Sequence, residues 1–103
     1  EVNIAREPQK AGLDVSEVRP FLRRMADFPN IRVCGLMTMM PLGAPESDLR
    51  GWFRRMRTLF DQLREEAISG VEMRELSMGM SQDYIIAAQE GATMVRVGTA
   101  LYR

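Results

Sequence analysis

Several residue types that build reactive sites are rare or missing in the 103-residue sequence. There is no histidine, which removes the commonest general base and the usual Cys/His zinc sites. We therefore expect no metal centre and assign no catalytic residue. Cys34 is the only cysteine, so no internal disulfide can form and a reducing cytoplasm fits best. Among the 14 basic residues, Lys10 is the only lysine.

Net charge and long apolar runs are also absent. Fourteen basic and fourteen acidic residues cancel, which argues against nucleic-acid binding and against a polybasic membrane anchor, because both need excess positive charge. No apolar run approaches the roughly 20 residues that span a bilayer, and residues 1–4 resemble a strand rather than a signal peptide. What remains is the ordinary composition of one small globular domain, 46% hydrophobic and 27% charged.

Apolar stretches alternate with helical patterns along the whole chain. Strands are expected at residues 2–5, 31–40, 73–78 and 93–101. Helices are expected after Asp14, where Glu17 completes a capping box, from residue 46 or 47, and from Ser81 to about Glu90. This alternation predicts a parallel sheet. Four strands are few for such a fold, which indicates roughly half of an eight-stranded TIM-type β/α barrel.

The second expected helix has one apolar face and several arginines on its other faces. We predict that these arginines form a solvated helix surface rather than a stripe that binds nucleic acid. Cys34, in the middle of a strand, is expected to be a small buried hydrophobic residue rather than a nucleophile.

Residues 77–83 could hold an anion, because a strand runs there through small residues into a helix. Gly79 would allow close approach of the backbone to a ligand. Ser77 and Ser81 offer hydroxyls, and the helix start after Ser81 would present free N–H groups. The alternative is a plain turn in which Ser81 caps the helix and Asp83 supports it.

Arg96 interrupts the last apolar strand. A buried arginine is costly unless it meets a partner. Gly98 and Thr99 follow at the carboxyl end of this strand, where ligands bind in barrels and in open α/β folds. The alternative is an arginine that reaches past the strand end to solvent. Together the two segments predict that residues 77–99 form a strand–loop–helix–strand unit that holds a phosphate group.

The ordered set of motifs resembles the pyridoxal-phosphate homeostasis protein family. The strongest likeness lies in residues 77–83 (SMGMSQD) followed by residues 94–99 (MVRVGT). Residues 2–4, 10–12 and 35–39 are similar to the family's preceding strands and loops. The resemblance covers essentially the whole chain, and it identifies residues 1–103 as the C-terminal half of a single barrel domain similar to the N-terminal domain of alanine racemase.

The resemblance implies a site for pyridoxal 5′-phosphate (PLP). Its implied cofactor-binding residues are Ser77, Met80, Ser81, Arg96, Gly98 and Thr99. The serines, Gly98 and Thr99 would surround the phosphate, while Arg96 would face the pyridine nitrogen. Because a guanidinium cannot accept a proton, it disfavours a protonated ring and weakens the cofactor as an electron sink. That suits a protein of intracellular PLP homeostasis without strong catalysis of its own. Asn3 is a weaker candidate for the pocket rim.

The family's Schiff-base lysine lies in the N-terminal half, which is absent from these residues. Lys10 sits in the loop after the first strand and does not match it. The expected partners are PLP or phosphate and either the missing N-terminal half or a second copy, with no nucleic acid and no membrane. Two other functions stay open: a PLP-dependent amino-acid racemase on the same barrel, and a half-barrel association module without a ligand.

Overall fold

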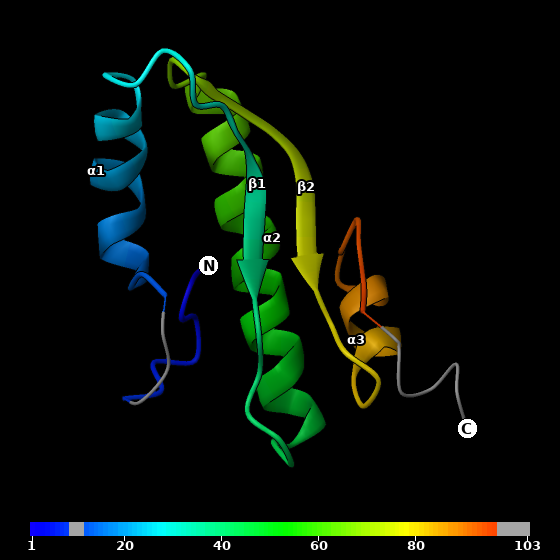
Figure 1. Ribbon diagram of the computed structural model, residues 1–103. Helices are drawn as coiled ribbons and strands as arrows, with labels where there is room; N and C mark the ends of the chain where they lie inside the picture. The colour runs from blue at the N-terminus through cyan, green and yellow to red at the C-terminus, as the bar shows by residue number, and fades with distance from the viewer. Residues whose placement is uncertain (9–11, 97–103) are drawn as a thin grey trace.

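The computed structural model describes residues 1–8 and 12–96, so the predictions for Lys10, Gly98 and Thr99 lie outside the described residues. Within these residues, five elements follow one another in the order helix, strand, helix, strand, helix (Figure 1). They are α1 (Val15–Met25), β1 (Val33–Thr38), α2 (Glu46–Glu66), β2 (Val71–Met78) and α3 (Tyr84–Gln89).

The described parts of all four predicted strands lie side by side, although only two of them form full strands. β1 and β2 pair in parallel, with Thr38 opposite Met78. The first segment joins β1, because the Val2 N–H donates to the Met37 carbonyl at 2.8 Å. The last segment joins β2 through an isolated parallel bridge between Ser77 and Met94. The order and direction are those expected of consecutive units of a β/α barrel.

Local signals explain where α1 and α2 begin and which faces they bury. The Ser16 N–H donates to the Asp14 carboxylate at 3.1 Å, and the Asp14 N–H donates to Glu17 at 2.9 Å. This is the predicted capping box. The apolar face of α2 is confirmed as the centre of the core, where Phe53 and Phe60 are fully buried.

α3 begins later and is shorter than predicted. It spans six residues from Tyr84 rather than about ten from Ser81. The Asp83 carboxylate accepts a hydrogen bond from the Met80 N–H at 2.6 Å, and Asp83 has a non-helical φ of −141°. A short polar side chain that bonds its local backbone offers the chain an alternative to a helical turn. The predicted helix start after Ser81, with its free N–H groups, is therefore wrong.

The sheet has one covered face and one open face. Leu36 pairs with Leu76 and Thr38 with Met78. All four are buried, and the three apolar ones belong to the core that α2 shares. Figure 1 shows α2 behind the two strands and no described element in front of them. Met37 and Ser77 pair on this other face and remain partly exposed, which we call the open face of the sheet. In the described part of the chain, no helix has the length and hydropathy needed to cross a membrane.

Candidate functional site

The carboxyl ends of the strands gather most of the predicted site residues that the structure describes. Ser77 lies one residue before the end of β2, on the open face of the sheet. Met80 and Ser81 follow in the loop between β2 and α3. Arg96 lies two residues beyond Met94, which pairs with Ser77. All four are partly buried.

Asp83 organises the loop that carries Met80 and Ser81. Its side chain is 4% exposed and accepts the Met80 N–H, while its own N–H donates to the Met80 carbonyl at 3.1 Å. The Met80 N–H is therefore committed to the loop and is not free for a phosphate. From its sequence position, Asp83 was expected only to support the helix start. An aspartate three residues after Met80 is the one feature of the sequence that indicates this bond.

Gly79 serves packing as well as backbone conformation. Its φ is +103°, and a Cβ built on it would lie 2.6 Å from the Ala87 Cβ. Ala87 is fully buried in α3. Glycine is thus needed because α3 packs directly on the end of β2. This contact differs from the close approach of a ligand that the sequence suggested.

Arg96 bridges the ends of both strands. Its backbone N–H donates to the carbonyl of Gly79, which lies just after β2, at 2.9 Å. Its guanidinium Nη2 donates to the Thr38 carbonyl at 3.3 Å, at the end of β1. The Nε atom is buried and has no hydrogen-bond partner among the described residues. Arg96 therefore lies across the sheet end rather than reaching only into solvent, and it has hydrogen-bonding capacity to spare.

A second unsatisfied polar atom belongs to Glu7, which lines a cavity at the same end of the sheet. This cavity of about 330 Å³ is formed by Glu7, residues 39–42, Met80 and Gln82. Its walls are therefore the loops after the first segment, after β1 and after β2. The Glu7 Oε1 atom is buried without a hydrogen-bond partner in the described structure. Glu7 was not predicted as a site residue, because nothing in the sequence around a loop glutamate indicates that a carboxylate oxygen is buried.

Ser81 belongs to a different hollow from Met80. A cavity of about 320 Å³ lies between the start of α2 and α3, with Glu46, Arg50, Ser81 and Tyr84 in its lining. Ser77 and Arg96 line neither this hollow nor the cavity beside Glu7. In the described chain, the predicted site residues thus share one end of the sheet without sharing one closed pocket.

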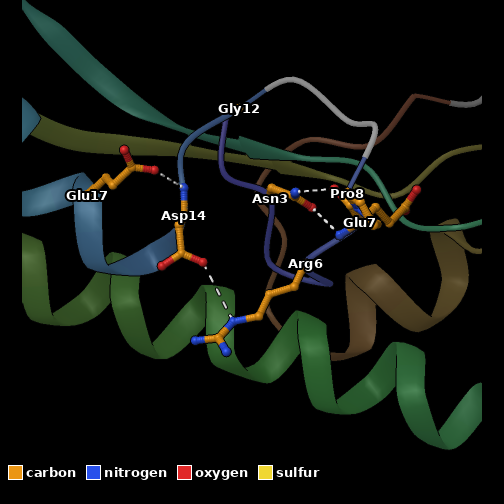
Figure 2. Close-up of a pocket in the computed structure, with 7 residues that line it drawn as sticks. All are labelled: Asn3, Arg6, Glu7, Pro8, Gly12, Asp14 and Glu17. Atoms are coloured by element: carbon orange, nitrogen blue, oxygen red, sulfur yellow. Dashed lines mark hydrogen bonds and ion pairs between the residues drawn. The ribbon is translucent and has the colours of Figure 1, made fainter.

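The most voluminous of these hollows, about 500 Å³, lies around the loop before α1 (Figure 2). Its polar groups are largely paired with one another. The Asn3 amide donates to the Glu7 carbonyl at 2.7 Å and accepts the Glu7 N–H at 3.0 Å. Hydrogen bonds from Ser16 hold the pKa of Asp14 below its ordinary value, and the more distant Arg6 guanidinium, at 3.6 Å, lowers it further. Asn3 therefore holds its own loop, which leaves its amide little capacity for a ligand.

Comparison with known proteins places the chain in a family. The model of the alanine racemase N-terminal domain matches residues 2–103, so the chain belongs to that family. It is 40% identical over 102 residues to a pyridoxal phosphate homeostasis protein of Aquifex aeolicus, covering 99% of this chain and 44% of that protein. The protein of the same name from Escherichia coli strain K12 is 34% identical over 107 residues, covering 99% and 42%.

Two solved structures of PipY from Synechococcus elongatus share the fold. The structure without PLP has a TM-score of 0.88 at 36% identity and covers 99% of this chain and 47% of PipY. The structure with PLP bound has a TM-score of 0.83 at 34% identity, with the same coverage. The predicted resemblance and the partial TIM-barrel-like fold are therefore confirmed. The chain spans less than half the length of these relatives, and its assignment to their C-terminal half stays a prediction.

Proposed function

We propose that the chain is part of a PLP-binding protein of pyridoxal-phosphate homeostasis, and that it supplies the side of the site facing the phosphate and the pyridine nitrogen. The observation that carries the proposal is the position of Arg96 across the ends of β1 and β2, with a buried Nε that lacks a partner in the described chain. The relatives named for this role, and the neighbour solved with PLP bound, support the choice of ligand.

The chemistry of Arg96 fits a pyridine nitrogen. Arginine carries only donors and stays protonated, so it can donate to the ring nitrogen but cannot receive a proton from it. PLP supplies an electron-withdrawing ring that stabilises carbanions best when its nitrogen is protonated. An arginine at this position therefore favours holding the cofactor over using it as a catalyst. We accordingly propose a protein without strong catalysis of its own.

The phosphate side of the proposal rests on hydroxyl groups near the end of β2. Ser77 lies on the open face, and Ser81 follows four residues later in the loop that Asp83 organises. Met80 would contribute as a wall of the cavity beside Glu7, because its N–H already bonds Asp83. Contributions from Gly98 and Thr99 remain a prediction outside the described residues.

The open face of the sheet suggests what completes the site. Met37, Ser77 and Met94 share this face, and no described element lies in front of it. Apolar surface left uncovered in this way favours association. Because the chain spans less than half of its relatives, we propose that the remaining half of the barrel covers this face and supplies the lysine that the family uses. A second copy of the same chain is the alternative occupant.

The proposal is tested by titrating the full-length protein with PLP and recording absorbance and fluorescence. The wild type should bind PLP, whereas Arg96→Ala should bind it about ten- to a hundredfold more weakly, as expected when a charged hydrogen-bond donor is removed from a ligand site. Arg32→Ala is the matched control. Arg32 is exposed and ion-paired with Glu72, and it lies just before β1, at the end of the strands opposite to Arg96.

Two results would contradict the proposal. One is a wild-type protein that does not bind PLP, and the other is equal PLP affinity in the Arg96→Ala variant and the Arg32→Ala control. An assay for amino-acid racemisation by the PLP-loaded protein addresses catalysis separately. Turnover comparable to that of an alanine racemase would favour the racemase alternative.

A further inference from the structure

Three arginines on one side of α2 form hydrogen bonds with the two residues that follow α3. Arg50, Arg54 and Arg57 recur at spacings of four and three residues, so they lie along one stripe of the helix. We call them the arginine stripe. The Glu90 carboxylate is bound from two sides, by Arg50 Nη1 at 3.0 Å and by Arg54 Nε at 2.8 Å. The Glu90 side chain is only 10% exposed, which distinguishes this contact from an ordinary surface ion pair.

Arg57 bonds Gly91, the residue after Glu90. Its Nη1 donates to the Gly91 carbonyl at 2.9 Å, while its Nε pairs with Asp61 at 3.1 Å. Gly91 has a φ of +103°, and a Cβ at this position would lie 2.9 Å from the Arg57 side chain. The arginine stem and the chain at Gly91 are thus packed together as well as hydrogen-bonded.

From Gly91 a short stretch that is hydrogen-bonded to the neighbouring strand leads to Arg96. The Thr93 N–H donates to the Leu76 carbonyl at 3.0 Å, and the Met78 N–H donates to the Met94 carbonyl at 3.1 Å. The Arg96 N–H then donates to Gly79 at 2.9 Å. These bonds fix the register of residues 93–96 beside β2. Because the Arg57 contact holds Gly91 at the start of the same stretch, we expect it to influence where the Arg96 guanidinium lies.

We propose that Arg57, supported by the rest of the arginine stripe, is a positioning residue for the cofactor site: by holding Gly91 from outside the sheet, it aligns Arg96 with the ring of the bound cofactor. The proposal rests on the proposed function for the identity of that cofactor. It assigns a role to arginines that the sequence suggested were only a solvated surface.

Arg57→Met in the full-length protein tests this role, because methionine keeps an unbranched apolar stem and removes the guanidinium. Arg55→Met is the matched control, since Arg55 is exposed on the same helix and its side chain forms no hydrogen bond or salt bridge with a described residue. Arg96→Gln provides the reference spectrum for a ring nitrogen that has lost its arginine. Arg57→Lys, which keeps one charged donor, serves as a partial rescue.

Two measurements are made on each variant. The first is the absorption spectrum of bound PLP, which responds to hydrogen bonding at the ring nitrogen. The second is amide hydrogen exchange in the cofactor-free protein, comparing the backbone N–H of Arg96 with that of Phe53, a fully buried residue of α2. We expect Arg57→Met to shift the spectrum toward that of Arg96→Gln, and to speed exchange at Arg96 about three- to tenfold, the loss of roughly one hydrogen bond. Arg57→Lys should lie between Arg57→Met and the wild type.

The outcomes are distinguishable. An unchanged spectrum and unchanged Arg96 exchange in Arg57→Met would overturn the proposal. Faster exchange by the same factor at Arg96 and at Phe53 would also overturn it, because that result reports only a general loss of stability. If the wild type does not bind PLP, the proposed function fails, and the exchange at Arg96 alone decides whether Arg57 positions that segment.

Discussion

The guanidinium of Arg96 donates from Nη2 to the Thr38 carbonyl at 3.3 Å, across 58 residues of sequence. This partner is a neutral backbone group, and Arg96 forms no salt bridge with any carboxylate among residues 1–8 and 12–96. By contrast, most of the α2 arginines that form side-chain hydrogen bonds donate to a glutamate or an aspartate. Arg96 therefore has no acidic partner among the described residues and has an unpaired Nε donor at the end of the sheet, where an anionic or electron-rich ligand could bind.

The contact between Gly79 and α3 gives the first prediction. Gly79→Ala should lower the free energy of unfolding by about 2–4 kcal/mol, because the new Cβ would meet Ala87 at 2.6 Å and alanine disfavours a φ of +103°. Gly43→Ala is the control, since Gly43 also has a positive φ, of +77°, but has open space around it. Urea unfolding of both variants measures the difference. Equal losses in the two would show that the packing against Ala87 contributes nothing.

A second prediction concerns the bond between Asp83 and Met80. Asp83→Ala should destabilise the protein by about 1–3 kcal/mol, because it leaves the Met80 N–H without its acceptor in a partly buried loop. Asp83→Asn keeps an acceptor oxygen in the same place and should restore most of the loss. Thermal unfolding of the two variants checks this order. Equal stability of Asp83→Ala and the wild type would mean that solvent satisfies the Met80 N–H equally well.

Structural features that depend on residues close together in the sequence were predictable, and features that depend on contacts between distant residues were not. Asp14 and Glu17 lie three residues apart, so their capping box could be predicted and is confirmed. The predicted start of α3 was wrong because the Asp83 side chain competes with helical hydrogen bonding of the backbone. Helix propensity alone does not decide between the side-chain bond and the helical bond. The burial of the Glu7 Oε1 atom and the contact of Arg96 with Thr38 depend on loops and strands far apart in the chain, and no periodic pattern encodes them.

The same limit applies to the arginines of α2. Their alternation with the apolar face predicted a solvated surface, and Arg55 fits that prediction because it is exposed. Arg50 and Arg57 instead contact Glu90 and Gly91, which lie more than 30 residues further along the chain. An arginine that bonds the backbone of another element has the same sequence pattern as one that faces water.

The last prediction concerns acid stability and follows from Glu90. Hydrogen bonds from Arg54 and Arg50 hold the pKa of Glu90 below its ordinary value of 4.5. A carboxylate whose pKa is lower in the folded state stabilises the protein fully above its unfolded-state pKa, and this contribution is lost as the pH falls through the folded-state pKa. Glu90→Gln removes the charge at every pH. The variant should therefore be less stable than the wild type at neutral pH, and the gap should close as the pH falls below 4.5.

Urea unfolding midpoints between pH 7 and pH 3 measure this gap. Glu65→Gln is the matched control, because Glu65 is exposed on α2 and makes no hydrogen bond or salt bridge with a described residue. Its midpoint should follow that of the wild type at every pH. A gap for Glu90→Gln that stays constant down to pH 3 would show that the stabilisation comes from side-chain packing at the end of α3. A gap that closes on acidification assigns the stabilisation to the negative charge of Glu90, which Arg50 and Arg54 both bind.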